Sequence, residues 1–159
     1  MKTYTLSAEQ FLPVKLDVAW DFFSSAKNLS RITPPEMQFK IINESEDDAI
    51  YNNMVIDYIV RPLLGIPLKW KTVITQVNKP YQFADMQKKG PYKKWVHVHT
   101  FIEKDNGTLV KDVVTYALPF GILGRFAHFL FIRKKLEQIF EFRKETLENL
   151  FPGDSEKIS

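Results

Sequence analysis

The sequence contains no cysteine. Disulfide bonds, metal sites built on thiolates and catalysis by a thiol are therefore excluded. The sequence also lacks an uninterrupted apolar run long enough to span a bilayer as a helix. Its first residues, MKTYTLSAEQF, have no apolar segment of the kind found in secretory signals. These features predict a cytoplasmic protein without an integral membrane segment.

Neither sign of charge dominates, because 22 Lys and Arg against 19 Asp and Glu give a formal net charge of +3. Acidic and basic residues are interspersed along the chain, which is not typical of nucleic-acid-binding proteins. The densest basic stretch, Lys88-Lys89 and Lys93-Lys94, flanks Gly90-Pro91 and is explained by a solvated hairpin end. No helix-turn-helix or RNA-recognition pattern accompanies it. We therefore expect no nucleic-acid partner.

Bulky apolar residues are abundant. Hydrophobic residues make up 45% of the 159 residues, and 13 of them are phenylalanines. A chain of this length buries a sizeable core within one domain. We predict a single domain over residues 1–151, followed by a flexible polar tail, 152–159.

The first two thirds of the sequence have the short apolar segments of β-strands. A first strand is predicted from Thr3 to Pro13. Six more are predicted at about Gln38–Glu44, Asn53–Arg61, Leu68–Val77, Gln82–Lys88, Tyr92–Glu103 and Thr108–Leu118. Short turn segments separate most of them, and Asn106-Gly107 is the strongest hairpin signal. Connections this short favour an antiparallel meander.

Two regions have helical periodicity. After the first strand, Asp17 is a candidate N-cap for a short helix through Ala26, with one further turn at 28–33 before Pro34-Pro35 stops any helix. From near Leu123, one long amphipathic helix is predicted by apolar residues at three- and four-residue steps. Its stripe comprises Phe129, Ile132, Leu136, Ile139, Phe140, Arg143, Leu147 and Leu150. Lys and Arg at 133–135 and 143–144 are assigned to the solvent side, with Arg143 the one charged residue near the stripe.

These elements predict an α+β fold. A curved antiparallel sheet of about seven strands cannot close its own concave face, so the long helix must lie across it. Any space left between sheet and helix becomes a cavity.

The segment from Trp95 to Phe101 has the pattern expected of a cavity wall. Trp95, His97, His99 and Phe101 alternate with other residues, so they share one face of a strand. With a two-residue turn at Asn106-Gly107, Asp105 faces Thr108. His99 then faces Val114, with Asp112 and Tyr116 as its diagonal neighbours. In this register Phe101 opposes Asp112, His97 opposes Tyr116 and Trp95 opposes Leu118.

We expect this aromatic and histidine face to point inward, because two imidazoles, Asp112 and Tyr116 can satisfy each other's hydrogen bonds. Trp70, with Thr72 and Ile74 on its strand face, extends the same lining. Two interpretations stay open. The cluster is either a self-satisfied polar network in a dry core or the polar part of a cavity that orients an apolar ligand.

Several groups of residues resemble the START-like superfamily, also called the polyketide cyclase/dehydrase or Bet v 1-like group. They are Val18-Ala19-Trp20-Asp21-Phe22, Asn28-Leu29, Ile32-Thr33-Pro34, Trp70 with Thr72 and Ile74, Phe83-Ala84-Asp85, Gly90-Pro91-Tyr92, the Trp95–Phe101 pattern, Asp112 with Tyr116, Leu118-Pro119-Phe120-Gly121, Gly124, and Ile139-Phe140 before Arg143. Within the superfamily, the chain is similar to bacterial members that also occur fused to epimerase-like proteins known as cell-division inhibitors. The resemblance extends to about Phe151. It implies a helix-grip fold, in which a curved sheet wraps a long C-terminal helix around a deep apolar cavity.

The expected function is binding of a small hydrophobic or amphipathic molecule, such as a lipid, polyketide or isoprenoid-like metabolite. Trp70, Trp95, His97, His99, Phe101, Asp112 and Tyr116 are the predicted ligand-binding residues. The alternative is a cyclase-, dehydratase- or isomerase-like enzyme that uses His, Asp and Tyr for acid-base chemistry in the same cavity. No cofactor is expected.

Two further possibilities concern other sites. His97, His99 and Asp112 could supply three metal ligands, but their spacing does not require a metal, and none is expected. The connections Pro62–Pro67 and Phe120–Gly124 are unusually apolar. They either cap the core or form lips of the cavity that open or touch a membrane.

Overall fold

The structure is a computed structural model that describes residues 1–43, 48–62 and 64–153. In this part of the chain, seven strands form one antiparallel sheet in the order β1-β7-β6-β5-β4-β3-β2. The strands are β1 (Tyr4–Leu12), β2 (Lys40–Ile41), β3 (Val55–Val60), β4 (Leu68–Asn78), β5 (Gln82–Lys89), β6 (Lys94–Lys104) and β7 (Gly107–Ala117). The predicted meander is confirmed, and β1 closes it by pairing with β7.

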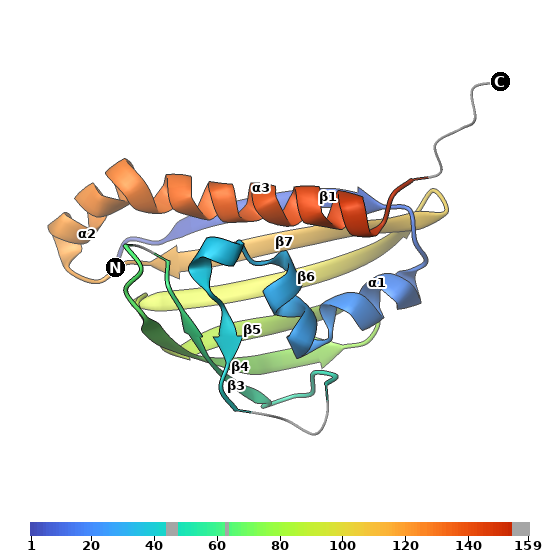
Figure 1. Ribbon diagram of the computed structural model, residues 1–159, viewed down its shortest axis with the longest axis horizontal. Helices are drawn as coiled ribbons and strands as arrows, with labels where there is room; N and C mark the ends of the chain where they lie inside the picture. Colours follow the sequence, from blue (N-terminus) through green and yellow to red (C-terminus); the bar gives the residue numbers. More distant parts are fainter. Residues whose placement is uncertain (44–47, 63, 154–159) are drawn as a thin grey trace.

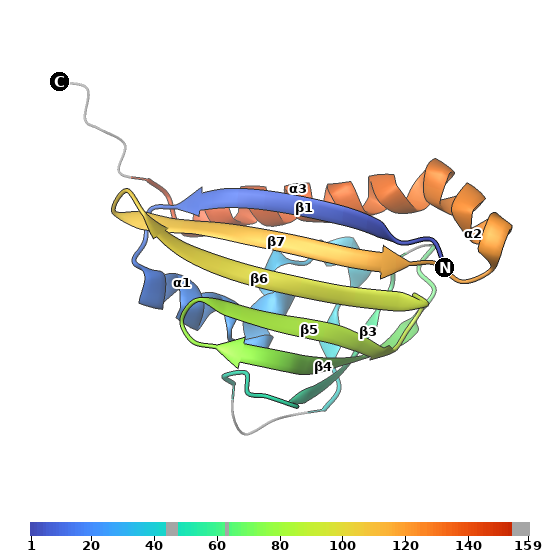
Figure 2. The same ribbon diagram turned by 180° about the vertical axis from the view of Figure 1, so that it is seen from behind.

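The helices lie on one face of this sheet (Figures 1 and 2). They are α1 (Leu16–Phe23), the 3-10 turns η1 (Ala26–Ile32) and η2 (Pro35–Met37), α2 (Gly121–Ala127), the π-helical segment η3 (His128–Ile132) and α3 (Arg133–Leu150). Helix α3 lies across the curved sheet, as the α+β helix-grip fold requires. No helix of the described segments is long and apolar enough to cross a membrane.

The core has separate apolar clusters on the two sides of the concave face. Around α1, Trp20 packs edge-on against Phe83 and Phe101. Under α3, Leu136 packs with Val114 and Tyr116 of β7. The space between these clusters contains the polar groups described below.

The predicted register of the β6–β7 hairpin is wrong by two residues. Lys104 pairs with Gly107, so the turn residues are Asp105 and Asn106, and both have positive φ. This geometry is typical of a type I′ turn, which Asp and Asn tolerate. A shift of two residues keeps the alternation of faces, so the predicted inward face is unchanged.

The first helix differs from its prediction at both ends. Asp17 is not the N-cap: the helix begins at Leu16, and Asp17 instead accepts a hydrogen bond from the N–H of Val18. The helix ends at Phe23, before the predicted Ala26, because residues 24–26 form backbone hydrogen bonds with residues 48–50. Pro35 begins the short turn η2, since proline is tolerated at the first helical position.

The C-terminal helix is continuous but changes phase at η3. Its π-helical turn shifts the inward face, so His128 is buried whereas Phe129, predicted in the apolar stripe, is 84% exposed. Two residues predicted on the solvent side line the cavity instead: Lys135 is half-buried, and Arg143 is buried. The predicted tail falls mostly on residues 154–159, outside the described residues.

Candidate ligand-binding site

The inward orientation of the β6 face is confirmed. His97, His99 and Phe101 are buried, and Trp95 is half-buried against Tyr116, its partner on β7. Each belongs to a central strand with hydrogen-bonded neighbours on both sides. The backbone therefore holds these side chains in fixed positions.

Two carboxylates and two imidazoles form a compact cluster on this face. Nε2 of His97 lies 2.7 Å from Oδ1 of Asp112, and Nε2 of His99 lies 3.1 Å from Oδ2 of Asp85. The two imidazole rings stack with centroids 3.7 Å apart. In the register, His97 faces Asp85 and His99 faces Asp112, so both hydrogen bonds run diagonally between strands.

The pKa values of the two histidines in the cluster are shifted in opposite directions. Burial lowers the pKa of His97, and the charge of neighbouring His99 lowers it further. Burial also disfavours protonation of His99, but its contacts with Asp112 and Asp85 raise its pKa above the ordinary value. Burial would raise the pKa of Asp112, yet the two histidines and Arg143 hold it well below its usual range. The raised pKa of His99 and the lowered pKa of His97 make His99 the more basic of the two imidazoles.

Arg143 brings a positive charge to the cluster from helix α3. Its Nη1 lies 3.5 Å from Oδ1 of Asp112, and its guanidinium lies 4.9 Å from the centre of the Phe140 ring. The side chain is buried, and Nε and Nη1 have no hydrogen-bond partner among the described residues. Burying an arginine without satisfying all its hydrogen bonds lowers the stability of the folded protein.

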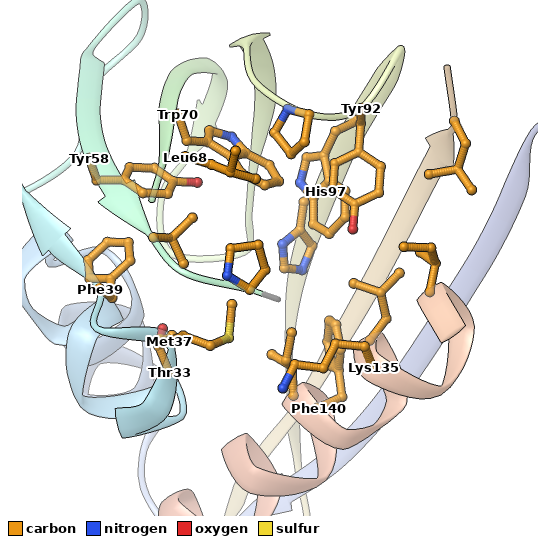
Figure 3. Close-up of a pocket in the computed structure, with 18 of the residues that line it drawn as sticks. Thr33, Met37, Phe39, Tyr58, Leu68, Trp70, Tyr92, His97, Lys135 and Phe140 are labelled. Atoms are coloured by element: carbon orange, nitrogen blue, oxygen red, sulfur yellow. The ribbon is translucent and has the colours of Figure 1, made fainter. Parts of the chain in front are cut away.

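A cavity of about 330 Å³ separates the sheet from α3 (Figure 3). Its size falls in the range of small-molecule sites, about 300–1,000 Å³. Its labelled lining side chains are Thr33, Met37, Phe39, Tyr58, Leu68, Trp70, Tyr92, His97, Lys135 and Phe140. A second cavity of about 150 Å³ adjoins it and shares the lining residues Leu29, Tyr58, Trp95, His97 and Arg143.

Aromatic side chains form much of the cavity wall and contribute few polar atoms to it. Tyr58 stacks on Trp70, and Trp70 meets Trp95 edge-on. Burial raises the pKa of Tyr58 and Tyr92 far above the physiological range, so both remain neutral phenols. The indole Nε1 of Trp70 is buried without a partner among the described residues. The wall thus combines apolar area with a few hydrogen-bond donors.

The seven predicted site residues do not all reach the cavities. Trp70, Trp95 and His97 line the larger cavity, and His99 lines the smaller one. Asp112 contacts both histidines and lines neither of these two cavities, but it lines a third one of about 220 Å³ between β1 and α3. Phe101 and Tyr116 also line neither. Phe101 lies in the core beside Trp20, and the Tyr116 hydroxyl makes a hydrogen bond to Nε2 of His128, 2.8 Å away.

Sequence reasoning missed two residues of the cluster. Asp85 belongs to β5, and no pattern in the sequence determines the register of β5 against β6. Arg143 was detectable, because it is the one charged residue within the apolar stripe of the long helix. A charged residue on a buried face indicates a partner or a ligand.

The cluster also has the composition of a possible metal site. Asp85, His97 and His99 each offer one ligand atom, and these atoms lie within 4.8 Å of one another. Both Nε2 atoms are directed at carboxylates in the observed arrangement. A metal would have to replace those hydrogen bonds, so the geometry fits a proton-sharing network better than a coordination sphere.

Comparison with known proteins assigns the chain to a family. Residues 12–143 match the profile of the family described as polyketide cyclase/dehydrase and lipid transport. The chain belongs to this family. Curated proteins give no match. The family assignment confirms the resemblance seen in the sequence and accords with binding of a small molecule in a cavity.

Solved structures confirm the fold of this family member. A START superfamily protein from Mycobacterium smegmatis is similar over 92% of this chain and 96% of its own, with a TM-score of 0.68 and 13% identity. Major latex-like protein 151 from Panax ginseng is similar over 95% and 99%, with a TM-score of 0.64 and 12% identity. A nucleoside-diphosphate sugar epimerase from Corynebacterium glutamicum is 23% identical over 91% of this chain but only 28% of its own, with a TM-score of 0.63.

Proposed function

We propose that the protein binds a small amphipathic molecule without transforming it. The apolar body of the ligand lies against Tyr58, Trp70 and Trp95, and its polar end reaches His97 and Arg143. The observation that carries this proposal is the cavity itself, whose apolar walls converge on two buried polar side chains. Aromatic walls stabilise a bound apolar group by about 25 cal/mol per Å² of area removed from water.

The unpartnered donors support an amphipathic ligand over a purely apolar one. Nε1 of Trp70 and Nε and Nη1 of Arg143 have no hydrogen-bond partner among the described residues, and both side chains line the cavity. A ligand oxygen near these groups satisfies donors that a hydrocarbon leaves unpaired. Nε2 of each histidine, by contrast, makes a hydrogen bond with Asp112 or Asp85.

Of the predicted site residues, Trp70, Trp95, His97 and His99 are retained here as ligand contacts, and Asp112 as the residue that positions the histidines. Phe101 and Tyr116 are not retained as ligand contacts: Phe101 packs against Phe83, and Tyr116 packs against Trp95. The cytoplasmic location and the absence of a nucleic-acid partner, both predicted from the sequence, are also part of this proposal.

The test is to extract natively purified protein with organic solvent and to identify the released molecules by mass spectrometry. Ile139→Trp, which places an indole into the cavity from α3, is the matched variant. We expect a compound that is stoichiometric with the wild-type protein. Less of this compound should be recovered from the variant. Equal recovery from both proteins would contradict the proposal, provided that both have the same circular dichroism spectrum.

A further inference from the structure

One end of the molecule is formed by segments that are far apart in the sequence. Because the sheet is antiparallel, β3, β5 and β7 end where β1, β4 and β6 begin. Figures 1 and 2 show the N-terminus, the β3–β4 connection and α2 at this same end. We call this region the α2 end and define it as residues 1–3, 61–69 without 63, 87–95 and 118–136.

The α2 end exposes a large number of apolar side chains. Helix α2 and η3 contain few polar residues, and only Gly124 and His128 among them are buried. Phe120 is 81% exposed, Phe129 is 84% exposed and Leu64 is 94% exposed. Ile122, Leu123, Phe126, Phe131 and Ile66 are also more than half exposed. Soluble domains seldom expose such a continuous apolar surface unless it meets a partner.

The same end concentrates positive charge. Its four segments contain 11 of the 22 Lys and Arg residues and none of the 19 Asp and Glu residues. Outside these segments, Glu137 of α3 pairs with Arg133 at 2.9 Å. Glu36 precedes Met37, whose carbonyl accepts a hydrogen bond from the N–H of Arg61. The rest of the chain has an excess of acidic residues. The interspersed charges of the sequence are therefore segregated in space.

The apolar surface is continuous with the cavity. Pro62, Pro119 and Phe120 line the larger cavity, and each belongs to a connection at the α2 end. Gly124 lines it from α2, where its hydrogen faces the carbonyl of Pro119 too closely to admit a Cβ. Helix α2 is thus held directly beside the mouth of the site proposed above.

We propose that the α2 end docks onto the surface of an anionic lipid bilayer. The apolar side chains of α2 and η3 enter the interface between headgroups and acyl chains, and the surrounding Lys and Arg pair with lipid phosphates. An apolar helix flanked by basic residues meets the requirements of such an interface. In this orientation the mouth of the cavity faces the membrane.

The charge distribution favours a bilayer over the other possible occupants. A second copy of the chain would bring two strongly basic ends together, and their repulsion opposes association. A nucleic acid would pair with the basic groups but would leave the exposed Ile and Leu side chains in water. Lipid headgroups and acyl chains satisfy both kinds of group at once.

The experiment is co-sedimentation with vesicles of phosphatidylcholine and with vesicles of an equimolar mixture of phosphatidylcholine and phosphatidylglycerol. Binding to the anionic vesicles, weakened by salt, is expected. The double variant Phe126→Gln/Phe129→Gln should lower the partition coefficient about tenfold or more, because two apolar anchors are lost. Neither residue lines the cavity, and glutamine is a good helix former. Tyr81→Gln, an exposed site in the β4–β5 turn, is the control and should bind like wild type.

Charge is tested separately with Lys134→Gln, which should weaken binding to anionic vesicles about fivefold. Lys104→Gln, at the other end of β6, is its control. Three results would overturn the proposal. The protein could bind both vesicle types equally, or lose its binding to vesicles when a single-stranded oligonucleotide is added. It could also form a dimer in solution that the double variant dissociates. Extraction of a bound molecule from the double variant tests the cavity alone, so failure of docking and failure of ligand binding are distinguishable.

Discussion

His97 and Asp112 are bonded diagonally across neighbouring strands, with Nε2 of His97 2.7 Å from Oδ1 of Asp112. The residue directly opposite Asp112 is His99, whose Nδ1 lies 2.9 Å from the same oxygen but off the direction of a hydrogen bond. Arg143 lies 3.5 Å from that oxygen as well. One buried carboxylate is thus the counter-ion for three nitrogen groups beneath helix α3.

Asp112→Asn should lower the free energy of unfolding by about 3 kcal/mol at neutral pH. The amide keeps the shape of the side chain but removes the negative charge that lies against Arg143 and the two histidines. The measurement is denaturation by urea. Asp57→Asn is the matched control, because Asp57 pairs with Lys71 at the surface and its loss should cost less than about 1 kcal/mol. Equal losses in the two variants would refute the counter-ion assignment.

The pH dependence of stability follows from the same contacts. The folded pKa of Asp112 is depressed, so its contribution is fully present above the unfolded value of about 3.8 and is lost as the pH falls below it. The folded pKa of His99 is raised, so its contribution is present below 6.5 and is lost as the pH rises through the folded value. NMR titration of the imidazoles should place His99 above 6.5 and His97 below it. Equal pKa values for the two rings would contradict the assignment of His99 as the more basic histidine.

Tyr116→Phe should destabilise the protein by about 1–2 kcal/mol. Burial lowers the pKa of His128, so its neutral imidazole accepts a hydrogen bond from the Tyr116 hydroxyl, and the variant leaves Nε2 buried without a partner. Thermal or urea unfolding measures the loss. Tyr81→Phe, at an exposed tyrosine, should change stability by less than about 0.5 kcal/mol. If Tyr116→Phe leaves the free energy of unfolding unchanged, a water molecule replaces the hydroxyl as the partner of His128.

Strand order and helix placement were predictable because they depend on local patterns. The alternation from Trp95 to Phe101 fixed the inward face, and this prediction tolerated an incorrect turn at Asp105-Asn106 since the error was two residues. The turn itself was misplaced because Asp105-Asn106 and Asn106-Gly107 are both good turn sequences. The local pattern alone does not distinguish two registers that differ by two residues, because both place the same side chains on the same face.

The site was predicted less completely than the fold. Asp85 joins the cluster through the β5–β6 register, which depends on a turn around Gly90 that carries no residue-specific signal for its length. His128 reaches Tyr116 only because η3 changes the phase of the helix, and a π-helical turn has no clear sequence signature. Both residues depend on long-range packing that periodicity does not encode.

Protein purified without a histidine tag should contain far less than one equivalent of zinc. Asp85, His97 and His99 lie close enough to share an ion, but both Nε2 atoms are engaged with carboxylates. Elemental analysis after incubation with zinc and gel filtration measures the content. One equivalent that disappears in His97→Ala but persists in His128→Ala would establish a metal centre instead.

Arg143→Met should change which ligands the cavity prefers. The methionine keeps much of the side-chain length but removes the positive charge that lines both cavities. We expect the affinity for a long-chain carboxylic acid to fall about tenfold, as for loss of a charge-assisted hydrogen bond. The affinity for the alcohol of the same chain length should change little, because the apolar wall is intact. Competition with a fluorescent apolar probe measures both, and Lys144→Met, the exposed neighbour, is the control. Parallel losses for acid and alcohol would mean that Arg143 supports the wall and does not contact the polar end of the ligand.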